Sequence, residues 1–334
     1  MYLEFFGLKA KPFNNTPDPK FLYLTPGHRE ALAHLVYGVQ EQKGFIVLTG
    51  EVGTGKTTLL RALLERLDGS NTAVAFVFHS ALSFDDVLEY MLEDFGLGKV
   101  GKSRVECLVA LNDFLIERRR VGQNTAVILD EAQNLHPSTL EQIRLLSNAE
   151  TATDKLLQIV LVGQPELGAK LELAELRQLR QRIGLRCAIS PLTAAETGDY
   201  IRSRLRIAGA RDLSLFTERA VRRIAQYAGG IPRVVNLVCD HCLLIGYADQ
   251  TRRIDRDIVE RAIEYFEEGA LALPRRQGFA ALAPLRGFRW LVGALIASVI
   301  GILAGLALQP DAVAYVSDLV SGSLSSLADA LGAQ

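Results

Sequence analysis

The 334-residue sequence predicts an α/β fold with a parallel five-stranded sheet, an all-helical domain after it, and one C-terminal transmembrane helix. Three observations carry this prediction. Short apolar runs alternate with helical segments in the first part of the chain, and alternation of this kind indicates a parallel sheet covered on both faces. Amphipathic helical runs with no strand between them follow. A stretch of 19 residues without charge lies near the C-terminus.

Each expected strand is a short apolar run, and each expected helix carries apolar residues at helical spacing. The strands are expected at Gly44–Thr49, Thr72–Phe78, Thr125–Leu129, Leu156–Val162 and Leu185–Ile189. The helices among them are expected from Pro26, and at Leu59–Leu67, Phe84–Phe95, Ser103–Arg120, Ser138–Ala149 and Glu166–Arg182. The later helices are expected at Thr193–Ala208, Thr217–Ala228, Pro232–Tyr247 and Asp255–Phe266. A capping box of Thr193 and Glu196 marks where the all-helical region begins.

Residues 50–57 read Gly-Glu-Val-Gly-Thr-Gly-Lys-Thr, which is the G-x-x-x-x-G-K-[ST] pattern of a phosphate-binding loop between a strand and a helix. The glycines let backbone N–H groups reach phosphate oxygens, and the next helix points its positive dipole end there. Lys56 is expected on the β- and γ-phosphates, and the Thr57 hydroxyl on Mg²⁺. The alternative, a glycine-rich turn without a ligand, is disfavoured by the flanking strand and helix. The expected ATP contacts are Gly50, Glu51, Val52, Gly53, Thr54, Gly55, Lys56, Thr57 and Thr58.

A second candidate for the same chemistry is the pair of acids that ends the predicted strand Thr125–Leu129. In a parallel sheet, this strand brings Asp130 beside the phosphate-binding loop, where its carboxylate can hold Mg²⁺. Glu131 can then polarise an attacking water as general base. A solvated acidic turn is the alternative, but the pairing with residues 50–57 favours ATP hydrolysis.

The charge balance and the cysteine content indicate which classes of partner and metal ion to expect. The net charge is −1, with 37 basic and 38 acidic residues, so a nucleic-acid partner is not expected. The run Arg118-Arg119-Arg120 ends a predicted helix, where cations complement the helix dipole. Cys239-Asp240-His241-Cys242 has no second ligand pair at metal spacing, so packed thiols are expected there rather than zinc. The few cysteines fit a reducing compartment.

Residues 290–308 (WLVGALIASVIGILAGLAL) carry no charge, and a helix of this length spans about 28 Å, close to the thickness of the hydrocarbon core. Four arginines precede it and only acids follow, so the positive-inside rule places the N-terminal side in the cytoplasm. The basic residues before the segment 290–308 are Arg275, Arg276, Arg286 and Arg289, and the acidic residues after it are Asp311, Asp318 and Asp329. A buried core helix is the alternative. We expect a single-pass protein of the bacterial inner membrane, with a cytoplasmic ATPase and a periplasmic C-terminus.

The expected organisation therefore has six parts. The first is residues 1–42, which we expect to pack on the ATPase core. Then come the nucleotide-binding α/β domain at 43–190, the helical lid at 191–268, a Pro/Arg/Gly-rich linker at 269–289, the transmembrane helix at 290–308 and a short periplasmic tail at 309–334.

A phosphate-loop α/β domain with a helical lid resembles the AAA+ ATPases, and residues 1–268 resemble the general secretion pathway protein A family more narrowly. The stretches that carry the resemblance are YLEFFGL (2–8), PF (12–13), TPDP (16–19), GFIVLTGEVG (44–53), LDEAQNL (129–135), GQPEL (163–167) and GGIPR (229–233). The resemblance implies a cytoplasmic, oligomeric ATPase on a membrane anchor, tied to assembly of envelope secretion, pilus or polysaccharide-export machinery. Some members carry a large periplasmic domain, for which residues 309–334 are too few.

The resemblance also assigns roles to single residues. Gln164, after the strand Leu156–Val162, matches the polar residue that senses the γ-phosphate, although many AAA+ proteins have Asn there. Arg233, in Gly-Ile-Pro-Arg, matches the lid arginine that touches the nucleotide of its own subunit. Arg182 is the best match to the arginine finger that completes the site of a neighbour, with Arg180 and Arg177 as competitors.

Three functional hypotheses follow. The first is a membrane-anchored ATPase that uses ATP and Mg²⁺ in a homo-oligomer to drive assembly of envelope machinery. The second is a nucleic-acid-associated ATPase switch of the transposition or initiator type, for which a membrane span at 290–308 is not needed. The third is an ATP-gated scaffold without hydrolysis, against which Glu131 argues.

Overall fold

The computed structural model describes residues 2–15, 18–78, 82–98, 103–147 and 155–270. The chain divides into two units, Met1–Gly269 and Ala270–Gln334, and the fold and site described below lie in the first. The predicted transmembrane helix at 290–308 and the tail at 309–334 lie outside the described residues, as does the predicted linker from residue 271 onward. Among the described residues, no helix combines the length and the apolar character needed to cross a membrane.

The sheet has five strands in the order β2-β3-β4-β1-β5, and every neighbouring pair is parallel. Their bounds are Phe45–Gly50 (β1), Thr72–Val77 (β2), Asn124–Leu129 (β3), Gln158–Gly163 (β4) and Ile183–Ile189 (β5). The predicted parallel five-stranded sheet is therefore confirmed. Because all strands run the same way, the loops that follow them open at one edge of the sheet, and this edge carries the candidate site.

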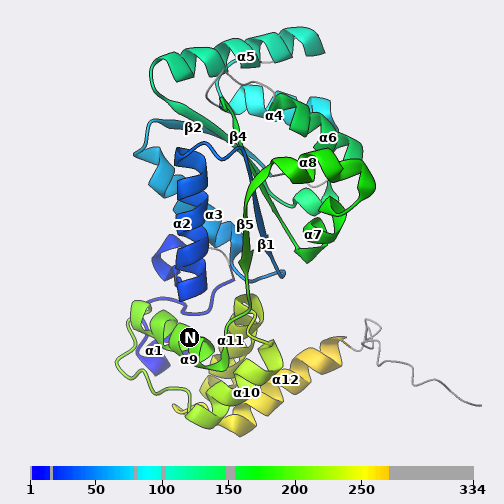
Figure 1. Ribbon diagram of the computed structural model, residues 1–334. Helices are drawn as coiled ribbons and strands as arrows, with labels where there is room; N and C mark the ends of the chain where they lie inside the picture. Colours follow the sequence, from blue (N-terminus) through cyan, green and yellow to red (C-terminus); the bar gives the residue numbers. More distant parts are fainter. Residues whose placement is uncertain (1, 16–17, 79–81, 99–102, 148–154, 271–334) are drawn as a thin grey trace, which may run out of the picture. The chain divides into compact units, whose positions relative to one another are not determined.

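Alternate residues of the inner strands enter two separate apolar cores. In β1, Phe45 and Val47 face one core, and Ile46 and Leu48 face the other. The helices α2 (Pro26–Gln40) and α3 (Lys56–Asp68) cover one face. The other face is covered by α4 (Phe84–Asp94), α5 (Arg104–Arg120), α6 (Pro137–Leu146), α7 (Pro165–Leu171) and α8 (Arg177–Arg182), as Figure 1 shows.

The segment predicted as one helix from Glu166 to Arg182 is instead broken into three pieces. Helix α7 ends at Leu171, a 3₁₀ turn spans Ala174–Leu176, and α8 begins at Arg177. A straight helix would turn Leu176 about 140° away from Leu171, since each residue advances about 100°. The break at Leu173, which is extended with ψ of 142°, lets both leucines enter the same core fully buried.

The region after β5 is helical, as predicted, and holds α9 (Ala194–Ile207), α10 (Glu218–Ala228), α11 (Pro232–Ala248) and α12 (Arg256–Ala270). The capping box of Thr193 and Glu196 is present at the start of α9. Cys239 and Cys242 are fully buried in its core, as expected for packed thiols. Burial in apolar surroundings raises the pKa of both thiols.

The N-terminal segment departs from its predicted packing on the ATPase core. Helix α1 (Tyr2–Phe6) and Phe13 pack in the core of the helical region, and the Tyr2 hydroxyl donates to Asp240 Oδ1 of α11 at 2.6 Å. Helix α2 packs against the sheet, together with Leu22 and Leu24 just before it. The reason is the aromatic content of the segment, because its large apolar side chains fill a core that the short helices α9–α12 could not close alone.

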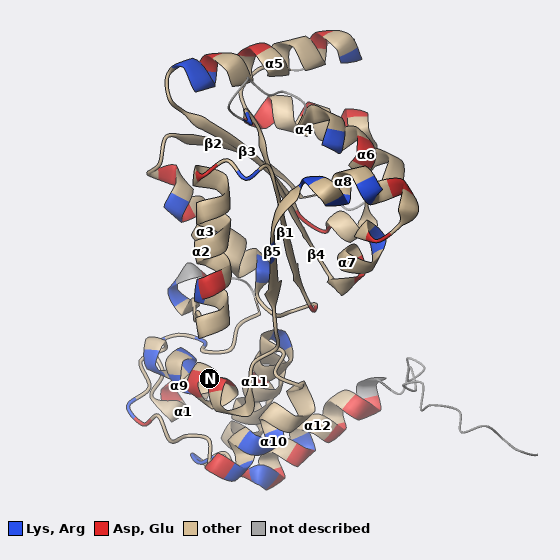
Figure 2. Ribbon diagram, viewed as in Figure 1, with Lys and Arg blue, Asp and Glu red and all other residues tan. Residues whose placement is uncertain are grey.

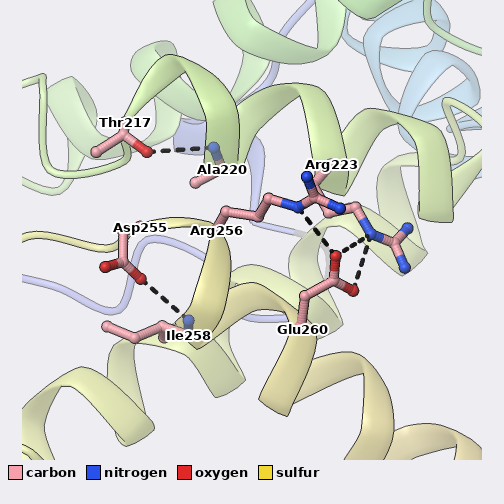
Figure 3. Close-up of polar contacts among 7 residues, drawn as sticks. All are labelled: Thr217, Ala220, Arg223, Asp255, Arg256, Ile258 and Glu260. Carbon is pink, nitrogen blue, oxygen red and sulfur yellow. Dashed lines mark hydrogen bonds and ion pairs between the residues drawn. The ribbon is translucent and has the colours of Figure 1, made fainter.

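Helices α10 and α12 are joined by an ion-pair network at Glu260 (Figure 3). The Nε atom of Arg223 in α10 donates to both carboxylate oxygens of Glu260, at 2.9 and 3.0 Å. Arg256, one turn before Glu260 in α12, donates to Oε1 at 3.1 Å. The two helices begin nearby with side-chain caps, Thr217 accepting from the amide of Ala220 and Asp255 from the amide of Ile258.

Candidate nucleotide-binding site

The loop between β1 and α3 has the curled backbone that its sequence predicts. Gly53 and Gly55 have φ of +81° and +102°, a region that side-chain-bearing residues adopt only with strain. A Cβ on Gly53 would also lie 2.8 Å from Cβ of Arg233, so only glycine fits this close approach. Helix α3 begins directly after the loop, and its first N–H groups face the same space.

Lys56 is the first residue of α3, and its side chain folds back over the loop. It is only 6% exposed, and its Nζ donates to the carbonyl oxygens of Gly50 at 2.7 Å and Glu51 at 3.1 Å. Burial lowers the pKa of Lys56, while the carboxylates of Glu131 and Asp130 act in the opposite direction. A buried cation that faces two carboxylates is suited to bind an anion that brings its own metal ion.

A cavity of about 400 Å³ opens in front of the loop. Its walls come from four segments distant in sequence, namely the N-terminal segment, the loop with α3, the end of β3, and the helical region. The lining residues are Asn14, Asn15, Asp18, Phe21, Val52, Gly53, Gly55, Lys56, Thr57, Thr58, Glu131, Tyr200, Arg204, Pro232, Arg233 and Asn236. A smaller cavity of about 60 Å³ shares some of these residues and is lined by more apolar ones, among them Leu22, Tyr23 and Leu59.

Asp130 and Glu131 follow β3 at the same edge of the sheet. Asp130 is 3% exposed and accepts the amide of Glu131 at 2.9 Å, and burial raises the pKa of its carboxyl. Glu131 is held in the left-handed region at φ +53° and lines the cavity. A non-glycine residue in this conformation stores strain, which recurs at functional sites.

Glu131 accepts two side-chain hydrogen bonds on one oxygen. The amide nitrogen Nε2 of Gln133 donates to Oε2 at 2.6 Å, and that of Gln164 donates to the same atom at 3.3 Å. The Gln133 Oε1 atom in turn accepts the backbone amide of Gln164 at 3.0 Å. The predicted residues Glu131 and Gln164 are thus brought together, and Gln133 joins them. The sequence alone gives Gln133 no role, because its partner Gln164 follows a different strand, β4.

Arg233 lies at the start of α11 directly above the loop. Its backbone amide donates to the carbonyl oxygen of Gly53 at 3.3 Å, and the residue lines the cavity. Some of the residues predicted to contact the nucleotide or the metal ion do not line the cavity, namely Gly50, Glu51, Thr54, Asp130 and Gln164. They shape the loop or support the residues that line the cavity.

The three arginines considered for a finger have different surroundings. Arg182 ends α8 and donates from Nη1 to the Ser147 hydroxyl at 2.7 Å, and Arg180 pairs with Glu172. Arg177 is exposed, and no hydrogen bond or ion pair of it occurs within the described part of the chain. None of the three lines the cavity of their own chain.

Sequence reasoning missed the polar wall of the cavity. Arg204 of α9 donates to the Tyr200 hydroxyl at 2.7 Å and to the carbonyl oxygens of Pro12 and Asn14, and Tyr200 donates to Asn236 Oδ1 at 2.9 Å. The arginine also lies over the ring of Phe21, at 4.9 Å. The N-terminal segment is thereby tied to the helical region beside the cavity. An arginine and a tyrosine one turn apart on a helix were the available signal, but their periodicity indicates only an amphipathic helix.

The comparisons with known proteins agree with this geometry. The family described as AAA domain matches residues 39–171. General secretion pathway protein A of Aeromonas hydrophila is 44% identical over 255 residues, which cover 76% of this chain and 46% of that protein. The chain thus spans less than half the length of this curated relative.

Solved structures with the same fold include Cdc6p from Pyrobaculum aerophilum, which is 21% identical with a TM-score of 0.60 and covers 79% of this chain and 74% of that one. The Aeropyrum pernix ORC1 protein in complex with DNA is also 21% identical, with a TM-score of 0.56, covering 80% and 73%. Identities this low show the fold alone.

Residues 39–171, which match the family described as AAA domain, contain the phosphate-binding loop. The resemblance predicted from the sequence is confirmed, and the chain is related to general secretion pathway protein A.

Proposed function

We propose that the chain is an ATPase that binds ATP with Mg²⁺ in the cavity in front of residues 50–57 and hydrolyses it. One observation carries the proposal. A buried lysine at the start of α3 meets a buried aspartate and a glutamate that follow β3, and an arginine of the helical region lines the same cavity. A phosphate chain needs this combination of fixed N–H donors, a cation and oxygen ligands for a metal ion.

Thr57 and Asp130 are the residues proposed to hold Mg²⁺. A hydroxyl and a carboxylate are oxygen ligands of the kind that Mg²⁺ takes, and the buried Asp130 carboxylate makes no hydrogen bond to a side chain among the described residues. When bound, the metal ion neutralises phosphate charge. Lys56 and the loop amides hold the β- and γ-phosphates, and Arg233 contacts the nucleotide from the helical side.

Glu131 is proposed as the general base that takes a proton from the attacking water. Its carboxylate lies in the cavity wall, and its oxygen Oε2 is held by Gln133 and Gln164. These two donors hold the carboxylate in place at the cavity wall, where a base must lie to reach the attacking water. Gln164 would reorient when a γ-phosphate offers it a second acceptor, which makes it a sensor of the bound nucleotide.

We further propose a homo-oligomer in which an arginine of one subunit completes the site of the next. Arg182 remains the preferred finger, with Arg180 and Arg177 as alternatives. Negative charge that develops on a phosphoryl group in the transition state is well stabilised by an added arginine. None of these three arginines lines the cavity of its own chain, so each is available to the site of a neighbouring subunit.

The cellular role is proposed as assembly of an envelope-spanning secretion, pilus or polysaccharide-export machine at the bacterial inner membrane. It is supported by the relation to general secretion pathway protein A and by the charge-free residues 290–308 with arginines before them. The ATPase would be cytoplasmic and the C-terminus periplasmic. Reporter enzymes fused after Gln334 and after Glu268 test this topology: one active only outside the cytoplasm should work at the first position alone.

A nucleic-acid-associated switch is the second candidate from the sequence. Likeness to DNA-bound initiators is a likeness of fold at 21% identity and does not favour it. Charge does not favour it either, because the arginines of α10 are accompanied by acidic residues along α12 (Figure 2) and the chain carries a net charge of −1.

The nucleotide site is tested with the purified full chain in detergent. Lys56→Ala should abolish binding of fluorescent ATP and ATP turnover, because the main counter-charge of the phosphates is lost. Lys11→Ala, which removes an exposed lysine, is the matched control and should behave like the parent. Parent protein that neither binds nor hydrolyses ATP would contradict the proposal.

A further inference from the structure

A buried histidine of the N-terminal region contacts the phosphate-binding loop from behind. His28 lies in the first turn of α2, is 5% exposed, and places Nε2 3.0 Å from the carbonyl oxygen of Thr54. Its other ring nitrogen, Nδ1, lies 2.7 Å from the Thr25 hydroxyl. His28 is far from the loop in sequence, and it lines the small cavity but not the one in front of the loop.

The local hydrogen bonds fix which ring nitrogen carries the proton. Thr25 is the N-cap of α2, and its hydroxyl oxygen accepts the backbone amide of His28 at 3.2 Å. The carbonyl oxygen of Thr54 can only accept a hydrogen bond, so the tautomer that satisfies both contacts has Nδ1 accepting the hydroxyl proton of Thr25. The remaining proton lies on Nε2, where it is donated to the carbonyl oxygen of Thr54.

This bond sets the plane of the peptide between Thr54 and Gly55. The peptide is trans, so its C=O and N–H point in opposite directions. With the carbonyl oxygen turned toward His28, the amide of Gly55 is turned away from it. Gly55 lines both the small cavity beside His28 and the 400 Å³ cavity in front of the loop. His28 thus presents one loop amide to the space where phosphate oxygens are expected.

The loop needs such a support because little else holds this peptide. Gly55 has no side chain and a φ of +102°, and the Thr54 hydroxyl is engaged with the Glu51 carbonyl oxygen at 2.8 Å. Within the described residues, His28 is the hydrogen-bond partner found for the Thr54 carbonyl oxygen. Thr54 is 1% exposed, so water would not readily replace the histidine.

We infer that His28 is a positioning residue of the nucleotide site, which through the Thr54 carbonyl oxygen holds the Gly55 amide ready for a nucleoside di- or triphosphate. The inference rests on the proposed function. It couples the anchoring of α2 to nucleotide affinity. Since the β-phosphate is common to both nucleotides, loss of the bond should weaken ADP and ATP alike.

The test compares two amide replacements in the full chain, with fluorescent ADP and ATP as probes. In His28→Gln the amide nitrogen can take the place of Nε2, whereas the shorter side chain of His28→Asn reaches only the position of Nδ1. We expect His28→Gln to keep dissociation constants within about threefold of the parent. His28→Asn should raise both by about tenfold or more, because a buried carbonyl oxygen loses its donor. His34→Asn, at an exposed position of the same helix, is the matched control.

Thermal unfolding of each variant separates this role from a purely structural one. Equal affinities in the Gln and Asn variants, whether both high or both low, would overturn the inference, because packing and not the hydrogen bond would then decide. A parent protein that binds neither nucleotide would overturn the proposed function and this inference with it. That outcome is distinguishable, since the parent would already fail.

Discussion

The backbone amide of Arg233 donates to the carbonyl oxygen of Gly53, so the helical region touches the phosphate-binding loop through main-chain atoms. Because only main-chain atoms take part, the contact does not depend on the side chain of Arg233 or on the charge of neighbouring side chains. It means that a movement of α11 relative to the sheet must break or stretch a bond to the loop. Nucleotide binding and the position of the helical region are coupled at this point.

The turn before α11 should be the most sensitive backbone position near this contact. Gly230 has φ +75°, and a Cβ there would lie 2.0 Å from the carbonyl oxygen of Leu192. Gly229 has φ +56°, but a Cβ there would meet open space. Chemical denaturation should therefore give a loss of about 1 kcal/mol for Gly229→Ala and at least about 2 kcal/mol for Gly230→Ala. Similar losses in both variants would show that the Leu192 contact relaxes freely.

The bond between Gln164 and Glu131 predicts an effect on turnover rather than on binding. Gln164→Ala removes a donor from the carboxylate and the proposed sensor of the γ-phosphate, so kcat should fall about tenfold or more. The dissociation constant for ADP should change little, since ADP has no γ-phosphate. Steady-state kinetics and equilibrium binding on one preparation check both. A variant with normal kcat would remove Gln164 from the mechanism.

The strands were predictable because each is an apolar run between turn residues, and the predicted and observed bounds of β2 differ by one residue. The phosphate-binding loop was predictable because its whole motif is contiguous. The hydrogen bond between Gln133 and Gln164 was not predictable, because it depends on β3 and β4 being neighbours in the sheet. Hydrophobic periodicity predicts strands but not their order in a sheet. His28 was missed for a related reason, because its partner Thr54 comes from a distant segment. One signal existed, a histidine at the third position of a Thr-capped helix.

The Glu260 network predicts a pH-dependent contribution to stability. Hydrogen bonds from Arg223, and then from Arg256, hold the pKa of Glu260 below its usual value. A carboxyl group whose pKa is lower in the folded state than in the unfolded state stabilises the fold at pH values above its unfolded pKa of about 4.3. This contribution is lost as the pH falls through the folded pKa. Glu260→Gln should therefore cost up to about 1 kcal/mol at pH 7 and progressively less below pH 4.

Urea unfolding at several pH values measures this difference. Glu264→Gln, an exposed position of the same helix, is the control and should show little effect at any pH. A Glu260→Gln penalty that did not change between neutral and acidic pH would assign the effect to packing rather than to charge.

The proposed finger predicts that activity depends on assembly. Arg182→Ala should bind ATP normally yet turn over slowly at every protein concentration, whereas the parent should become more active per subunit as concentration rises. Loss of a finger can cost about 10³–10⁵ in rate. Mixing Arg182→Ala with Lys56→Ala should restore activity, because each supplies what the other lacks. If the mixture stays inactive, Arg180→Ala and Arg177→Ala mixtures locate the finger, and full activity in a monomer would contradict the oligomer.

Glu131 is proposed to act as the general base for hydrolysis of ATP bound in the cavity in front of residues 50–57. The most direct measurement is the identity of the nucleotide that remains bound after the full chain is incubated with ATP and Mg²⁺ and passed through a desalting column. We expect ADP on the parent protein and ATP on Glu131→Gln, because a neutral amide retains the site but cannot take a proton. ADP recovered in equal amounts from both proteins would contradict it.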